Sequence, residues 1–256
     1  MYSLKNRVVF ITGASSGIGR SCARAFAGTG ARLILAARRL QRLEELAAEL
    51  KRKPGEGILL LTIDIRDQPA VERAVSGFPS EWAAIDVLVN NAGLSRGLDK
   101  FQEGKLDDWE EMIDVNIKGL LYVSRAVIPG MVKRGHGHVI NIGSIAGHEV
   151  YPGGNVYCAT KSAVDALSKG MRLDLSGMGL RVSQVTPGMV ETEFSLVRFR
   201  GDKVRAGKVY QGLTPLSPDD IADAIVYCAT RPPHVNISQM IVMPTDQASA
   251  TMVHRK

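Results

Sequence analysis

A short apolar run near the N-terminus leads directly into a turn rich in glycine and serine. Residues 8–11 read Val-Val-Phe-Ile, residues 12–19 read Thr-Gly-Ala-Ser-Ser-Gly-Ile-Gly, and a helix-like pattern follows to about Gly28. Strand, glycine turn and helix in this order form the fingerprint of a dinucleotide site, because the glycines allow a tight turn and a close approach of phosphate to backbone. Amide groups at the helix start then bind the phosphates. The alternative is a glycine-rich turn without a ligand. The predicted binding residues here are Gly13, Ser15, Ser16, Gly17, Ile18 and Gly19.

The rest of the chain alternates between strand-like and helix-like segments. Apolar stretches predict strands at residues 32–36, 58–62, 86–89, 138–142, 181–186 and 239–243. Helical patterns lie at residues 40–51, 68–77, 106–133, 155–176 and 218–230. This alternation favours a parallel sheet with right-handed crossovers and helices on both faces. We therefore expect an α/β fold, a single doubly wound Rossmann domain over residues 1–256 with about seven parallel strands.

Polar residues follow the predicted strands at the points where those strands end. Asp64 and Ile65 follow one strand, the stretch Asn90-Asn-Ala-Gly93 another, Ser144 a third, and Pro187-Gly188 a fourth. In a sheet of this kind, ligands bind beyond the carboxyl ends of the strands. A single such residue would be ordinary turn chemistry, but successive strand ends of this type indicate one shared site.

Tyr157 and Lys161 are four residues apart in a predicted helix, so they share one face of it. We expect the Lys161 ammonium to lower the pKa of the Tyr157 phenol, which is ordinarily near 10. A phenol adjusted in this way can exchange a proton with a carbinol oxygen. Ser144, thirteen residues before Tyr157, accompanies the pair.

Composition argues against several other functions. The net charge is +6, but aromatic residues make up only 5% and the basic residues are scattered, so we expect no nucleic-acid partner. His136 and His138 are flanked by glycines, which favours a turn over a metal site, and we expect no metal. The apolar run at residues 58–63 is too short to cross a membrane. Three scattered cysteines and the lack of a signal-peptide pattern lead us to expect a cytoplasmic protein.

Taken together, the motifs resemble those of the short-chain dehydrogenase/reductases, in family order and spacing over almost the whole chain. The resemblance implies that Tyr157 is the catalytic acid/base, and that Lys161 lowers its pKa and binds the nicotinamide ribose. It further implies that Ser144 steadies the substrate oxygen and that Asn116 holds a water linking Lys161 to solvent. Other positions matching cofactor contacts are Asp64 and Ile65 (adenine), Asn90 (ribose), Thr192 (carboxamide), Ala92, Gly93, Pro187, Gly188 and Val190.

A narrower resemblance lies in the C-terminal third. Residues 187–202, 234–237 and 243–247 are similar to those of NADP-dependent 3-hydroxy acid dehydrogenases, a group that includes serine/allo-threonine dehydrogenases and malonic semialdehyde reductases. The resemblance implies an NADP(H)-dependent oxidoreductase that interconverts a small 3-hydroxy acid and its 3-oxo acid or semialdehyde. It also implies a homotetramer, with the two longest helices in one interface. A reductase of sulfoacetaldehyde or other small carbonyl compounds is the alternative, and a non-catalytic dinucleotide-binding regulator is a second.

Two further expectations concern arginine side chains, one for the phosphate of the cofactor and one for the acid group of the substrate. Ala37 stands where NAD-dependent relatives have an acidic residue, and Arg38 and Arg39 follow it, so we expect a 2′-phosphate there and NADP as cofactor. The alternative for both is the polar start of the next helix. For the acid group of the substrate we choose Arg198, with Arg200 in reserve, in a substrate lid around residues 188–214. The alternative is that both are solvated lid charges.

Overall fold

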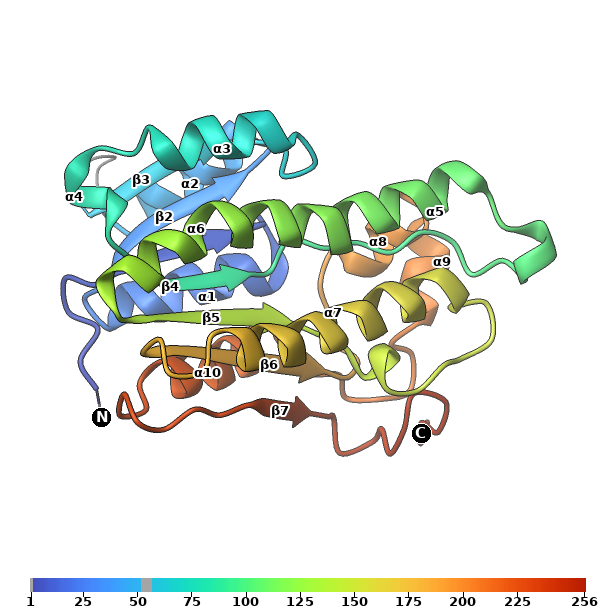
Figure 1. The fold of residues 1–256 in the computed structure, drawn as a ribbon. Coiled ribbons are helices and arrows are strands. Elements are labelled where there is room, and N and C mark those ends of the chain that lie inside the picture. Colours follow the sequence, from blue (N-terminus) through green and yellow to red (C-terminus); the bar gives the residue numbers. More distant parts are fainter. Residues whose placement is uncertain (1, 52–56) are drawn as a thin grey trace.

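A single seven-stranded parallel sheet organises the computed structural model, which describes residues 2–51 and 57–256. The strand order is β3-β2-β1-β4-β5-β6-β7, so the order of the strands along the chain reverses between β1 and β4. The strands are β1 (Val8–Thr12), β2 (Arg32–Ala37), β3 (Ile58–Thr62), β4 (Ile85–Asn90), β5 (Gly137–Ile142), β6 (Leu180–Pro187) and β7 (Gln239–Val242). Each boundary lies within one residue of the range expected from the sequence, and the doubly wound fold is confirmed (Figure 1).

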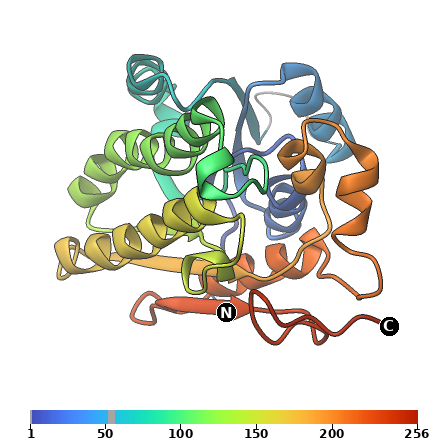
Figure 2. The ribbon, with the colours of Figure 1, turned by 90° about the vertical axis from the view of Figure 1, so that its right-hand side faces the viewer.

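Helices cover both faces of the sheet. One layer holds α1 (Gly17–Gly28), α2 (Leu40–Glu49) and α10 (Pro218–Ala229). The other holds α3 (Gln68–Ser76), α5 (Leu106–Ile113), α6 (Leu120–Arg134) and α7 (Asn155–Asp174). Figure 2 shows the two layers side by side, the first in blue and orange, the second in green and yellow.

The central strands are buried on both faces, which explains their continuous apolar sequences. In β1 the side chains of Val9 and Ile11 join the core on the α1 side, and that of Phe10 joins the core on the α6 side. All five residues of β1 are buried. With its side chains shared between two cores, the strand holds the following glycine turn in one place.

The prediction of a single helix over residues 106–133 is wrong in one respect. A π-helical turn, η2 (Asp114–Gly119), separates α5 from α6. The buried Asn116 side chain in this turn bonds to the backbone of Leu94 on the neighbouring segment, and Gly119 lies so close to Ile65 that a Cβ there would come within 2.5 Å of Ile65 Cδ1. These contacts fix the register of a turn wider than an α-helix. Such turns often occur at functional sites.

Between β6 and α10 the chain leaves the sheet and forms two short helices, α8 (Phe194–Arg198) and α9 (Lys203–Lys208). This segment includes residues 188–214, where the sequence predicts a substrate lid, and it lies over the carboxyl ends of the strands (Figure 1). The described residues also form three smaller elements, namely α4 (Ser80–Ala83), η1 (Phe101–Glu103) and η3 (Ile145–Gly147). Among the residues that the structure describes, no helix has the length and apolar character needed to cross a membrane.

Candidate active site

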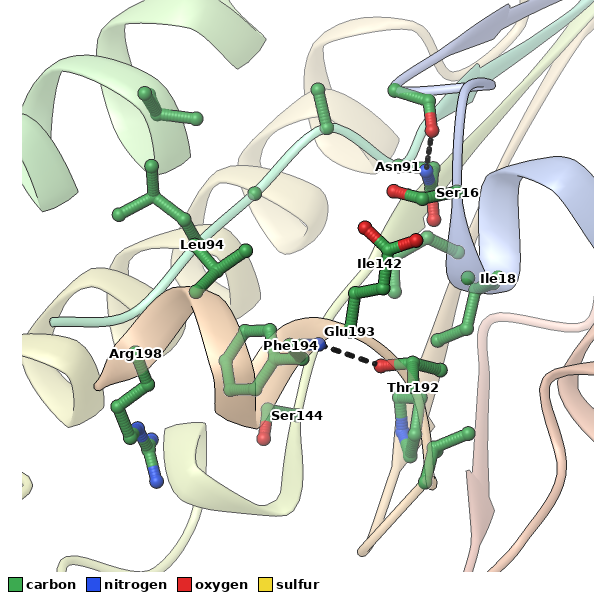
Figure 3. Close-up of a pocket in the computed structure, with 18 of the residues that line it drawn as sticks. Ser16, Ile18, Asn91, Leu94, Ile142, Ser144, Thr192, Glu193, Phe194 and Arg198 are labelled. Atoms are coloured by element: carbon green, nitrogen blue, oxygen red, sulfur yellow. Dashed lines mark hydrogen bonds between the residues drawn. The ribbon is translucent and has the colours of Figure 1, made fainter. Parts of the chain in front are cut away.

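A cavity of about 430 Å³ opens at the carboxyl ends of the strands, on both sides of the point where the strand order reverses. It lies where an open α/β sheet is expected to bind its ligand. Figure 3 shows its walls, formed by the glycine-rich turn, the segments after β4 and β5, and the start of α8. Of the residues expected from the sequence, its lining includes Gly13, Ser15, Ser16, Gly17, Ile18, Arg38, Arg39, Asp64, Ile65, Ala92, Gly93, Ser144, Tyr157, Lys161, Pro187, Gly188, Val190, Thr192 and Arg198.

The glycine-rich turn requires glycine for two different reasons. Gly13 and Gly17 have φ of 67° and 49°, in the left-handed region that favours glycine. Gly19 has no room for a side chain, because a Cβ there would come within 2.3 Å of the Gly13 carbonyl oxygen. Helix α1 starts at Gly17, and the Ser16 side chain makes no capping hydrogen bond. The positive end of α1 therefore faces the cavity with no side-chain cap at its N-cap position.

Basic side chains stand beside this turn. Arg38 and Arg39 follow the buried end of β2, and both are largely exposed at the rim of the cavity. The Arg39 guanidinium donates to the hydroxyls of Ser15 and Ser16 through Nη2, at 3.2 and 3.4 Å. Partial burial, and then repulsion from Arg42, lower the pKa of Arg39. A phosphate bound here would relieve that repulsion.

The segments after β3 and β4 contribute unequally. Asp64 and Ile65 line the cavity, and a hydrogen bond from Arg66 lowers the pKa of Asp64. Asn90 does not line it. The Asn90 amide is buried and donates to Ser124 Oγ and Asn141 Oδ1, both at 2.9 Å, because its side chain points toward the α6 and α7 layer.

The next residue, Asn91, was not singled out from the sequence. Its amide donates to the carbonyl oxygen of Thr12 at 2.9 Å, and its side chain would clash with a Cβ at Gly19. It lines the cavity and fixes the glycine-rich turn against the end of β4. The sequence offered two adjacent asparagines and no way to tell which one lines the cavity.

Tyr157, Lys161 and Ser144 come together at the other end of the cavity, with Tyr157 and Lys161 on α7 and Ser144 just after β5. Lys161 Nζ donates to the carbonyl oxygen of Ile142 at 2.9 Å, and burial lowers the pKa of Lys161 to about 8. Burial raises the pKa of Tyr157, and Arg198 and the Ser144 hydroxyl lower it by smaller amounts. Desolvation is the largest influence on the phenol, and the Lys161 ammonium is directed at a carbonyl, so a lowering of the Tyr157 pKa by Lys161 stays a prediction.

Asn116 lies behind this group, outside the cavity lining. Its Oδ1 accepts from Leu94 N at 2.9 Å, and its Nδ2 donates to Leu94 O at 2.8 Å and to Thr160 Oγ1 at 3.0 Å. The side chain is thus engaged in holding the segment after β4 against α7. Both Nδ2 protons are used in these bonds, so the side chain has no donor left for a water.

Arg198 enters the cavity from the last turn of α8. Its Nε donates to Ser95 Oγ at 3.0 Å, and its Nη2 donates to Tyr151 OH at 2.8 Å. Its guanidinium carbon lies 5.3 Å from the centres of the Tyr157 and Phe194 rings. Figure 3 shows it near Ser144, beyond Phe194. A fixed cation therefore stands beside the candidate acid/base.

The reserve candidate, Arg200, has a different environment. It pairs with Asp108 on α5 and does not line the cavity. Ser95 and Tyr151, which hold Arg198, were not singled out from the sequence, since no motif marks them. Within the described part of the chain, no group of three or more His, Cys, Asp and Glu side chains could hold a metal ion.

Comparison with known proteins shows the family to which the chain belongs. The family described as short chain dehydrogenase matches residues 7–201. The NADP-dependent 3-hydroxy acid dehydrogenase YdfG of Salmonella typhi is 48% identical over 97% of this chain and 99% of its own length. Sulfoacetaldehyde reductase 2 of Chromohalobacter salexigens is 46% identical over 97% of this chain and 98% of its own. The closed form of a serine dehydrogenase complexed with NADP+ superposes with a TM-score of 0.92 and 46% identity, covering 97% of this chain and all of that one.

Proposed function

Because this chain belongs to the short chain dehydrogenase family, we propose that it is an NADP(H)-dependent oxidoreductase that interconverts a small 3-hydroxy acid and its 3-oxo acid or semialdehyde. The observation that carries the substrate class is the position of Arg198, a fixed cation 5.3 Å from the Tyr157 ring centre. A carboxylate bound to Arg198 would bring a nearby hydroxyl of the same molecule to the phenol. The names of the relatives support the same class.

The residues at the other end of the cavity fit a phosphorylated dinucleotide. Gly17, with φ of 49°, has no side chain to keep a pyrophosphate from the backbone. Gly19 lets the helix pack closely on the turn, where a Cβ would clash with the Gly13 carbonyl oxygen. Ser15, Ser16, Arg38 and Arg39 offer hydroxyl and guanidinium donors at the end of β2. Ala37, the last residue of β2, brings no carboxylate of its own that would repel a 2′-phosphate. We therefore assign the site to NADP, with Asp64 and Ile65 at the adenine end.

Side chains of the protein would transfer the proton of the substrate hydroxyl. The bound dinucleotide supplies the hydride acceptor or donor and, when oxidised, a positive charge on its nicotinamide ring. Burial keeps the Tyr157 phenol protonated, so it is prepared to donate a proton to a carbonyl oxygen in the direction of reduction. Ser144 steadies that oxygen, and Lys161 binds the nicotinamide ribose. The backbone of Asn116 offers a carbonyl for the water that links Lys161 to solvent.

Arg198 retains a free donor for the acid group. Its Nε and Nη2 are bonded to Ser95 and Tyr151, whereas within the described residues its Nη1 has no hydrogen-bond partner. Charge-assisted hydrogen bonds to a carboxylate are among the strong ones in proteins. A sulfonate could occupy the same position, so a reductase of sulfoacetaldehyde is the second candidate, and the relative that carries this name supports it.

Steady-state kinetics test the proposal. The purified protein is assayed with NADP+ and NAD+ against serine, allo-threonine, 3-hydroxypropionate, 3-hydroxyisobutyrate and isethionate. We expect kcat/KM to be higher with NADP+ and highest for a 3-hydroxy acid. A preference for isethionate would favour the second candidate, equal or better efficiency with NAD+ would refute the cofactor assignment, and no turnover of any substrate would favour a binding protein.

We also infer a homotetramer in the cytoplasm, with residues 188–214 acting as the substrate lid. Large apolar side chains are exposed on α5 and α7, with Leu106 67% and Leu173 78% exposed, which supports contact with other copies of the chain. The three cysteines are free and buried, which suits a reducing compartment.

A further inference from the structure

A bridge of opposite charges crosses the cavity between the lid and helix α2. Glu193, at the start of α8, accepts two hydrogen bonds from Arg42 Nη1, at 2.6 and 2.8 Å. Arg39 Nη1 lies 3.8 Å from the same carboxylate. The two partners of the closest pair are 151 residues apart in the chain, so this contact exists only while the lid lies against α2.

The neighbouring lid residue makes a second contact across the cavity. A Cβ placed on Gly17 would come within 3.3 Å of the Thr192 side chain, so Thr192 rests against the glycine-rich turn. Figure 3 shows Glu193 extending from the start of α8 toward the turn that carries Ser16. Thr192 and Glu193 therefore span the cavity between its two ends, one with Arg38 and Asp64 and the other with Tyr157.

We propose that the Glu193–Arg42 ion pair is a clasp that retains the dinucleotide, so that the pair must open before the cofactor can leave. This inference rests on the proposed function, because it assumes that an extended dinucleotide occupies both ends of the cavity. Such a ligand must pass beneath Thr192 and Glu193. Neither Glu193 nor Arg42 is placed in the acid/base group, so both are positioning residues that act through the lid.

The exposure of the pair sets the size of the effect. The side chains of Arg42 and Glu193 are 36% and 44% exposed, so water and salt screen their attraction. Exposed pairs of this type stabilise a conformation only modestly, which corresponds to a change of about two- to fivefold in a rate that requires opening. A clasp of this strength retains the cofactor during turnover and still permits exchange.

The experiment measures the release of NADPH and of NADH from the full-length protein by stopped-flow fluorescence, with an excess of NADP+ as competitor. The variants are Glu193→Gln, Arg42→Gln and the double variant. Each single variant should release both cofactors about two- to fivefold faster than wild type, by a similar factor for each cofactor. The double variant should be no faster than Glu193→Gln, since that substitution already removes the carboxylate that Arg42 and Arg39 share. Glu191→Gln is the matched control, an exposed glutamate two residues earlier that should leave release unchanged.

Salt gives an independent readout. Raising the ionic strength should accelerate release from wild type toward the rate of the single variants, and should change those variants much less. Unchanged release in the single variants, or accelerations that multiply in the double variant, would overturn the clasp. Slower release of NADPH alone from Glu193→Gln would also overturn it, because Glu193 would then only repel the 2′-phosphate. If wild type binds neither cofactor, the proposed function itself fails, and that result is distinct from the others.

Discussion

The groups around Tyr157 have opposing effects on the pKa of its phenol. Burial favours the neutral phenol, whereas Arg198 and the Ser144 hydroxyl favour the phenolate. Lys161 is close in sequence, and its ammonium donates a hydrogen bond to the Ile142 carbonyl oxygen. The sequence predicted that Ser144, Tyr157, Lys161 and Arg198 share one site, and all four line the cavity. The balance among them depends on desolvation, which spacing along a helix cannot reveal.

At this scale the role of the phenol can be tested by removing its hydroxyl. Tyr157→Phe keeps the ring and its packing against Phe194 but has no proton to transfer. Since general acid/base catalysis is typically worth 10²–10⁴, we expect kcat to fall by at least about a thousandfold. NADPH binding, followed by fluorescence titration, should remain nearly normal. A variant that kept a tenth of the activity would mean that another group transfers the proton.

The burial of Lys161 predicts how the free energy of unfolding changes with pH. Its pKa is lowered from 10.5 to about 8 because burial disfavours the ammonium, so between these values the unfolded chain binds more protons than the folded one. The unfavourable effect is fully present below pH 8 and disappears as the pH rises to 10.5. Relative to Lys161→Met, the free energy of unfolding of wild type should rise across that window by on the order of 3 kcal/mol. Urea unfolding at a series of pH values measures it, and a difference that stays flat or falls would show that Lys161 is not desolvated.

Among the helices and strands, the sequence predicted the strand boundaries well, but it did not predict the π-helical turn or helix α8. Strands buried on both faces have continuous apolar sequences, and this is why their ends were placed within one residue. The π-helical turn at residues 114–119 arises from contacts of Asn116 and Gly119 with distant segments, and no local pattern encodes it. The same holds for α8, whose position depends on the hydrogen bond from Gly97 N to Arg198 O and on Glu193 reaching α2.

Helix α1 contains two glycines, one at each end, that can be compared by the same substitution. Gly19→Ala should destabilise the protein by about 1–3 kcal/mol and abolish NADPH binding, because the added Cβ would clash with the Gly13 carbonyl. Gly28→Ala, at the exposed end of the same helix, meets no atom within 4 Å and should be neutral or slightly stabilising. Urea unfolding and fluorescence titration measure both. Equal effects of the two substitutions would show that close packing at Gly19 is not what the turn requires.

At the scale of the whole molecule, exposed apolar side chains on α5, α6 and α7 remain unexplained by the fold of one chain. Leu106, Leu121 and Leu173 are 67%, 38% and 78% exposed. Isolated exposed apolar residues are ordinary, but several on adjacent helices indicate a surface that another protein covers.

Light scattering after gel filtration tests the assembly. We expect a mass about four times the 27.7 kDa of the chain. Leu173→Asp should lower that mass, because a carboxylate at a covered apolar contact is costly to desolvate. Leu40→Asp is the control, since Leu40 is also exposed but lies on α2 in the other layer. A wild-type monomer, or an unchanged mass for Leu173→Asp, would contradict this arrangement.

We propose that one cavity combines acid-group recognition by Arg198 with proton transfer by Tyr157. The most direct measurement compares kcat/KM for 3-hydroxypropionate and for 1-propanol, with NADP+, in wild type, Arg198→Ala and Arg200→Ala. Truncating a buried charge-assisted partner costs about 2–5 kcal/mol, so Arg198→Ala should lose at least about thirtyfold on the acid and little on the alcohol. Arg200→Ala, whose guanidinium pairs with Asp108 outside the cavity, should lose little on either. Equal losses on acid and alcohol, or no loss in Arg198→Ala, would contradict the account.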